Sequence, residues 1–143
     1  MWVSETVLVD TGAWLALFDS AADGHDAMLE VADLIELGHL IVPWPVAYET
    51  LRTRFVRRPA WVSAFNERLS QPSVTFVDDV EYCREAYSLT INSALIQQRD
   101  LSMVDVMCRM MIGDRDVDIK YLLTVNRKDF YDVCAANRVE IYP

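Results

Sequence analysis

Short apolar runs alternate with helical segments along this chain, and this alternation constrains the fold more than any other feature. The expected strands cover residues 6–10, 40–42, 74–77, 121–125 and 139–142. Each run is too short for a helix, and a stretch with apolar residues at helical spacing separates it from the next. Strands joined by helical crossovers pair in parallel, with helices covering the sheet. The sequence therefore predicts an α/β domain.

The segments between the expected strands carry helical periodicity. In one of them, Ala27, Val31, Leu34 and Ile35 fall on one helical face. The expected helices cover 12–18, 23–37, 45–55, 59–69, 81–97 and 102–111. Four glycines are few for an all-β protein with many tight turns. No Gly/Ser linker, repeat or low-complexity tract interrupts the pattern, so a single domain over residues 1–143 is expected.

The charge balance limits what the protein can bind. Thirteen basic and 22 acidic residues give a net charge of −9. This argues against broad, nonspecific nucleic-acid binding, which needs a positive surface, but leaves room for a local basic groove. The cysteines, Cys83, Cys108 and Cys134, form no zinc or redox pattern and are expected to be buried thiols in a reducing cytoplasm.

The chain shows no signal for a membrane. No apolar segment approaches the roughly 18 residues that a membrane span needs. The N-terminal residues 1–5 lack the positive lead of a secretion signal. We therefore expect a cytoplasmic protein.

Asp10 is the most informative single residue. It closes the apolar run Val7-Leu8-Val9 and is followed by Thr11 and Gly12. A carboxylate at the end of a buried strand is costly unless it meets a cation or hydrogen-bond donors. Ligands of open α/β sheets bind at the carboxyl ends of the strands, so Asp10 marks a candidate site.

Three other acids also stand on largely apolar segments. They are Glu49, Asp105 and Asp129. If the four carboxylates converge, their mutual repulsion favours a divalent cation, and oxygen ligands in a chain with two histidines favour Mg²⁺ or Mn²⁺. Such ions, about 4 Å apart when paired, activate water and stabilise an in-line phosphodiester displacement.

Each of these acids also has a purely structural interpretation. Ser102 and Asp105 match a helix capping box. Glu49 has the spacing to pair with an arginine on or near its own helix. Asp129 stands where it could cap a short helix beginning near Phe130. These alternatives stay open at the level of sequence.

Four segments together resemble the PIN-domain family, in particular the toxin ribonucleases of toxin–antitoxin modules. They occur in the expected order and cover nearly the whole chain: VLVDTGAWL at 7–15, PVAYE at 45–49, LSMVDVM at 101–107 and LLTVNRKDF at 122–130. The resemblance implies a three-layer α/β/α fold with a mainly parallel sheet of four to five strands. It also implies a metal-dependent endoribonuclease acting on RNA, a small antitoxin partner and a homodimer.

The resemblance also assigns roles to residues. Asp10, Glu49 and Asp105 would bind the metal directly or through water, and the hydroxyls of Thr11 and Thr124 would support the site. Many family members carry an acid directly after the threonine strand, where this chain has Asn126. The other family pattern places asparagine there and an acid before the phenylalanine. Asp129 matches that pattern and is the expected fourth ligand, with Asn126 as a neutral ligand or orienting group.

RNA binding requires positive charge near the acids. The segment after Glu49 supplies exposed candidates, since arginine contacts phosphate in a bidentate way. The candidates are Arg52, Arg54 and Arg57, continued by Arg58 and Arg68. His25 is a weaker candidate contact. A solvated helix face that balances an acidic protein is the competing interpretation for each arginine.

Two other functions fit parts of the sequence. The residues 10–13, DTGA, match the active-site loop of retroviral-type aspartic proteases, but that fold is all-β with a glycine-rich flap. The long helical stretch over 81–111 argues against it. A PIN-like domain that binds without cutting is the second alternative, because Asn126 departs from a common pattern and the protein is acidic.

Overall fold

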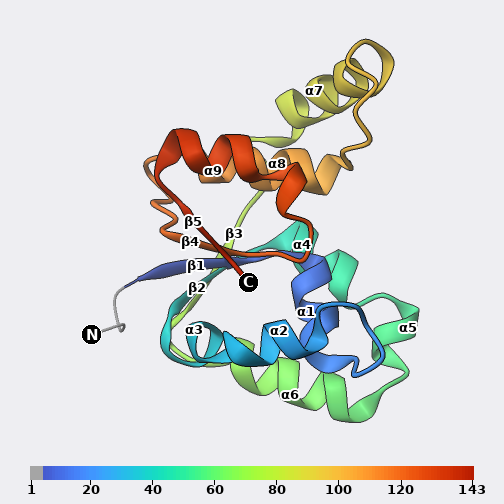
Figure 1. Cartoon of the computed structure of the whole chain (residues 1–143), viewed down its shortest axis with the longest axis vertical. Helices are drawn as coiled ribbons and strands as arrows, with labels where there is room; N and C mark the ends of the chain where they lie inside the picture. The colour runs from blue at the N-terminus through green and yellow to red at the C-terminus, as the bar shows by residue number, and fades with distance from the viewer. Residues whose placement is uncertain (1–4) are drawn as a thin grey trace.

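A five-stranded parallel sheet forms the centre of the computed structural model, which describes residues 5–143. The strands lie in the order β3-β2-β1-β4-β5, and all four pairings are parallel (Figure 1). Their bounds are β1 Thr6–Val9, β2 His39–Pro43, β3 Val74–Val77, β4 Tyr121–Leu123 and β5 Glu140–Tyr142. The N-terminal residues 1–4, on which the expectation about a secretion signal rests, lie outside the described residues.

Helices cover both faces of this sheet. Figure 1 shows α1, α2, α3 and α6 on one face and α8 and α9 on the other, with α7 projecting beyond α8. The bounds are α1 Thr11–Phe18, α2 His25–Glu30, α3 Ala32–Leu37, α4 Trp44–Thr50, α5 Thr53–Val56, α6 Pro59–Leu69, α7 Cys83–Leu95, α8 Met103–Ile112 and α9 Tyr131–Asn137, with a 3₁₀ turn at Arg127–Asp129. This three-layer α/β/α arrangement confirms the predicted fold class.

The central strand β1 is buried on both sides, as its continuous apolar sequence predicts. Val7 and Leu8 have no exposed surface, and Leu122 on the neighbouring β4 is equally buried. Under the α1–α6 layer, Trp14 and Phe65 meet edge to face with ring centroids 4.9 Å apart. Sheet and helices thus share one core, and this core holds the strand ends in place.

The strand register brings the sequence-distant segments of the candidate site to one edge. Leu8 on β1 pairs with Ile41 on β2 and with Leu122 on β4. Because all strands run in the same direction, Asp10, the start of α4 and Thr124 leave the sheet at its carboxyl edge. An all-parallel α/β sheet excludes the aspartic protease alternative, which requires an all-β fold.

Two expected helices are each divided in two. The segment 23–37 breaks at Val31, whose φ of −109° and ψ of 12° lie outside the helical range. The segment 45–55 breaks between α4 and α5, where Arg52 adopts an extended backbone with φ −78° and ψ 172°. The second break turns Phe55 into the core, where its ring meets that of Phe18 at 5.5 Å. Core packing therefore overrides the local periodicity.

Arg68 contributes to the fold and not to a basic surface. Its side chain is buried, and Nε donates to the carbonyl of Ile35 at 2.6 Å while Nη2 donates to the carbonyl of Gly38 at 3.0 Å. It thereby ties α6 to the end of α3 and the start of β2. The prediction that Arg68 continues the basic series toward RNA is wrong, because its guanidinium is buried and donates to main-chain carbonyls inside the protein.

None of the helices between residues 5 and 143 combines the length and the apolar character that crossing a bilayer requires.

Candidate metal centre

Asp10 lies at the carboxyl end of β1 and serves as the N-cap of α1. Its Oδ1 accepts a hydrogen bond from the Thr11 amide at 2.8 Å, and its Oδ2 accepts one from the Thr124 hydroxyl at 3.1 Å. Only 7% of its surface is exposed. Strand and helix therefore hold this carboxylate in one orientation, as the strand-end position predicts.

The electrostatic surroundings of Asp10 are unfavourable for a bare carboxylate. Burial raises its pKa to about 6, and the negative charges of Asp105 and Glu49 contribute in the same direction. The hydrogen bonds from Thr11 and Thr124 lower the pKa but do not compensate. A cation beside Asp10 would relieve both the burial cost and the repulsion.

Thr11 provides an independent indication that the position beside Asp10 suits a bound ion or its water. Its hydroxyl oxygen is buried and has no hydrogen-bond partner among the described residues. Buried hydroxyls are normally paired, so an unpaired one beside a buried carboxylate marks a polar position open to an ion or its water. The hydroxyl of Thr11 was expected to support the site; within the protein only its amide does so.

Asp105 stands in the first turn of α8 and completes the capping box. Its amide donates to Ser102 Oγ and its Oδ2 accepts from the Ser102 amide, both at 3.1 Å. The capping interpretation is therefore correct, but it does not exclude the site interpretation. One carboxylate oxygen closes the box, and the charge of Asp105 still acts on Asp10.

Glu49 lies on α4, next to the same edge of the sheet. Arg52 Nε donates to the main-chain carbonyl of Glu49 at 2.9 Å. Among residues 5–143, the carboxylate of Glu49 forms no ion pair within 4.0 Å. The alternative interpretation, in which the Glu49 carboxylate pairs with a nearby arginine, is therefore wrong. Its charge instead contributes to the raised pKa of Asp10.

Asn126 and Asp129 form the fourth part of the site through a chain of hydrogen bonds. The Asn126 amide nitrogen of the main chain donates to Thr124 Oγ1 at 3.0 Å, and its side-chain Nδ2 donates to Asp129 Oδ2. Thr124 in turn donates to Asp10. Asp129 does not cap α9, which begins without a side-chain cap. Asn126 therefore links the buried carboxylate of Asp129 to the Asp10 side of the site.

Two residues of α8 that the sequence did not assign to the site lie close to these acids. Cys108, one turn after Asp105 on α8, is buried, and burial together with the charges of Asp10, Asp105 and Glu49 raises the pKa of its thiol well above the usual range. Arg109 donates to the Asp129 carbonyl at 2.7 Å and pairs in a bidentate way with Asp132. The i+3 and i+4 spacing from Asp105 was the available signal for both.

The acids lie near one another without forming a ready-made ligand set. Among the described residues, no three His, Cys, Asp or Glu side chains could hold one ion as they stand. Asp10, Asp105 and Glu49 are nevertheless close enough for the latter two to raise the pKa of Asp10. Asp129 is connected to this group through the hydrogen bonds of Asn126 and Thr124. The donors are oxygen atoms, which suit Mg²⁺ or Mn²⁺.

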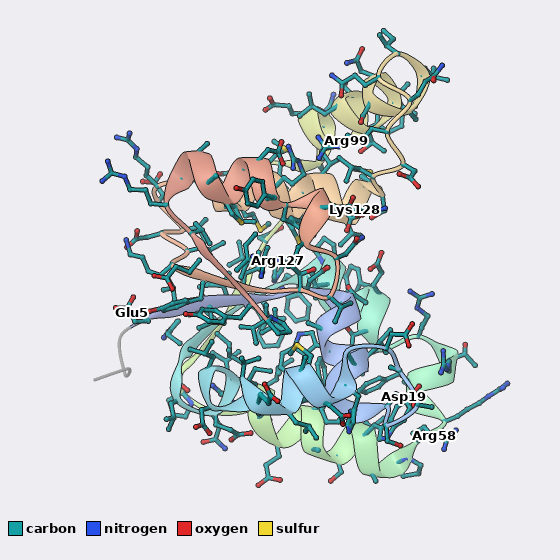
Figure 2. The ribbon with its side chains drawn as sticks, in the orientation of Figure 1. Glu5, Asp19, Arg58, Arg99, Arg127 and Lys128 are labelled. Carbon is teal, nitrogen blue, oxygen red and sulfur yellow. The ribbon has the colours of Figure 1, made fainter. Side chains whose placement is uncertain are left out.

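The expected basic residues lie mainly around α5. Arg52, Arg54 and Arg57 are exposed, and Arg54 pairs with Asp19 at 2.7 Å. Figure 2 shows Arg58 and Asp19 on the α6 side of the sheet and Lys128 on the α9 side. Lys128 is exposed and adjoins Asp129, and the sequence reasoning had left it out.

His25 has a structural role. Its Nδ1 lies 2.7 Å from the carbonyl of Ala16, so it joins α2 to α1. This contact explains its position without a bound ligand.

The sheet order, the helical layers and the acids at the carboxyl edge define a PIN-like α/β/α domain. Among solved structures, the chain is similar to VapC20 of Mycobacterium tuberculosis, described as a toxin that cleaves the sarcin–ricin loop. The TM-score is 0.68 with 22% sequence identity, over 96% of this chain and 99% of VapC20. No protein-family model and no curated protein sequence matches the chain. At this identity the likeness establishes the shared fold.

Proposed function

We propose that this protein is a Mg²⁺- or Mn²⁺-dependent endoribonuclease that acts as the toxin of a toxin–antitoxin pair. The observation that carries the proposal is the pair of negative charges, from Asp105 and Glu49, that act on buried Asp10 at the carboxyl edge of the sheet. Among residues 5–143 no ion pair joins a cationic side chain to these three acids, and such a group of acids is the arrangement that divalent-metal nucleases need. The fold shared with the toxin VapC20 supports the same class of function.

The residues of the site would have different roles in the proposed reaction. When bound, the metal would activate water and stabilise the charge that develops on the phosphodiester. Asp10, Glu49 and Asp105 would hold it, and Asp10 is already oriented by Thr11 and Thr124. Asn126 and Asp129 would complete the site from the opposite loop.

Arginines on the other side of the acids would hold the RNA backbone. Arg52 and Arg57 are exposed and follow Glu49 closely, so their guanidinium groups are available for phosphate. Arg54 would have to leave Asp19, an exchange that is cheap because the arginine is mostly exposed.

Cleavage of labelled RNA tests this function directly. We expect Asp10→Asn and Asp105→Asn to abolish Mg²⁺-dependent cleavage while the far-ultraviolet circular dichroism spectrum stays unchanged. Leu37→Ala, an exposed change at the end of α3, serves as the control and keeps activity. Cleavage that survives excess EDTA would show that the metal mechanism is wrong.

A homodimer belongs to the same proposal. Tyr87, Ile91 and Leu95 form an exposed apolar stripe along α7, whose contacts with the rest of the protein are mainly with α8. We propose that this stripe packs against a second copy. Sedimentation equilibrium should show a dimer that Leu95→Glu converts to monomers.

An antitoxin would restrain the nuclease. A small protein with a DNA-binding N-terminus and a disordered tail, encoded directly upstream, is the expected partner. We place the action of the protein in the cytoplasm, where its three free thiols would stay reduced. Co-purification of the upstream product as a complex that suppresses RNA cleavage tests the pairing.

The open spacing of the acids favours one alternative, a PIN-like domain that binds RNA or a partner without cutting. Isothermal titration calorimetry with Mg²⁺ separates the two. Equal, negligible binding by the native protein and by an Asp10→Asn/Asp105→Asn variant would favour the binding module.

A further inference from the structure

Three aromatic side chains form a row at the carboxyl edge of the sheet. Phe76 on β3 stacks on Trp44 with ring centroids 4.4 Å apart and planes 22° apart. Trp44 continues onto Tyr48, one helical turn further along α4, at 6.2 Å and 29°. We call these three residues the aromatic row. Large aromatic side chains usually contribute to the core, so their common exposure requires an explanation.

The exposed fraction of the side chain increases along the row from Phe76 to Tyr48. The exposed fractions are 37% for Phe76, 40% for Trp44 and 71% for Tyr48. Tyr48 is the last ring of the row, and Glu49 follows it directly. Trp44 follows Pro43, which is paired with Val77 at the same edge of the sheet where Asp10 leaves β1. The row therefore lies at the same edge of the sheet as the candidate metal centre.

A groove lies beside the row. It has a volume of about 330 Å³ between α4, α6 and β3, and Trp44 and Phe76 form one wall. The remaining lining is mostly apolar, including Val62 and Phe65, with the polar side chains of Asn66 and Ser70. An apolar slot with a few polar groups suits a flat heterocycle that needs stacking and one or two hydrogen bonds.

The charges next to the row favour an anionic ligand. Residues 50–66 contain no Asp or Glu in a protein with 22 acids, and they contain four exposed arginines: Arg52, Arg54, Arg57 and Arg58. Arg52 follows the end of α4 with an extended backbone, and its Nε donates to the Glu49 carbonyl at 2.9 Å. Surfaces that bind single-stranded nucleic acid combine aromatic rings with guanidinium groups in this way.

We propose that the aromatic row is a stacking platform for unpaired RNA bases, which sets the RNA beside the acids for cleavage. The proposal rests on the proposed ribonuclease function and extends it to substrate selection. Tyr48, the last and most exposed ring of the row, would stack on an unpaired base, while Trp44 and Phe76 support its ring from behind and Arg52 holds a neighbouring phosphate. The protein therefore selects single-stranded or looped RNA, because a base within a duplex has no free face.

Fluorescence anisotropy with a labelled oligoadenylate tests the platform. All proteins carry Asp10→Asn, which keeps the RNA intact. Tyr48→Leu should weaken binding about 5- to 100-fold, since stacking on one aromatic side chain contributes that much. Trp44→Leu should weaken binding in the same direction, because it removes the ring that supports Tyr48. An RNA of the same length with abasic riboses should bind the parent and both variants equally. Leu37→Ala, which truncates an exposed apolar side chain at the end of α3, should leave the affinity for oligoadenylate unchanged.

Three other results would each overturn the platform. Equal affinity of the parent and both variants for oligoadenylate, together with cleavage by the native protein, refutes the platform and leaves the ribonuclease intact. Absence of both binding and cleavage refutes the ribonuclease, and the platform with it. If Trp44→Leu converts a dimer to monomers in sedimentation without changing RNA affinity, the row is an interface between two copies.

Discussion

At the scale of single residues, Asp10 illustrates a conflict between stability and function. Its carboxylate is buried, and burial with two neighbouring negative charges raises its pKa to about 6. The two hydrogen bonds that it accepts orient it but do not compensate for the lost hydration. A residue selected for folding alone would not carry a charge here, so the position indicates a function that needs the charge.

The raised pKa predicts how stability depends on pH. The folded state keeps the Asp10 proton up to about pH 6, whereas the unfolded chain loses it near the ordinary aspartate pKa of 3.8. Stability therefore falls as pH rises between these values, and the loss persists above them. In EDTA, Asp10→Asn should be more stable than the native protein by about 3 kcal/mol above roughly pH 7. Urea denaturation measures the difference, which should vanish near pH 4; a constant difference would contradict the assignment.

At the scale of elements, the loop after β4 is fitted closely against the start of α1 and the turn before α2. A Cβ at Gly12 would stand 3.1 Å from Cγ2 of Val125, and one at Gly24 would stand 3.0 Å from its Cγ1. Gly24 also has a φ of 85°, which favours glycine. Val125 lies between Thr124 and Asn126, so these glycines set the position of both site residues.

Gly12→Ala tests whether that spacing matters. The added methyl should displace Val125 by a few tenths of an ångström and lower RNA cleavage about tenfold, because catalytic positions tolerate little displacement. The double change Gly12→Ala/Val125→Ala removes the contact and should restore most of the activity. A double variant as impaired as the single one would show that the loop position is not the cause.

The anchoring of α6 by Arg68 gives a second prediction at this scale. Arg68→Met leaves the carbonyls of Ile35 and Gly38 without their donors and should lower the free energy of unfolding by about 3 kcal/mol. Arg57→Met, an exposed change between α5 and α6, should alter it by less than about 0.5 kcal/mol. Chemical denaturation compares the two, and equal losses would contradict the structural role.

At the scale of the whole molecule, the shared sheet connects the acids to global stability. Because Asp10, Thr124 and α4 leave adjacent strands, a ligand that joins them crosslinks both helical layers. We expect Mg²⁺ to raise the melting temperature of the native protein, with about 2.7 kcal/mol of stabilisation at a hundredfold excess over its dissociation constant. Asp10→Asn/Asp105→Asn should show no such response in differential scanning calorimetry. An equal shift for both proteins would place the metal elsewhere.

The sequence predicted the strands better than the helix ends. A buried parallel strand such as β1 is a continuous apolar run, and this pattern is local. The breaks at Val31 and Arg52 depend on how Met28, Ile35 and Phe55 reach the core, which is a property of the assembled layers. The same reason explains Arg68: its sequence context is that of a surface arginine, and only the approach of α3 and β2 buries it.

By itself, the sequence determined the fold class and proposed the set of acids, because alternation of apolar strands with helices and acids on apolar segments are properties of neighbouring residues. Only the tertiary structure decided that Asp105 and Glu49 act on Asp10, that Asn126 links Asp129 to Thr124, and that Phe76 joins Trp44 and Tyr48. These relations join residues from different strands and helices. The parallel register of the sheet brings them to one edge, and no local pattern encodes that register.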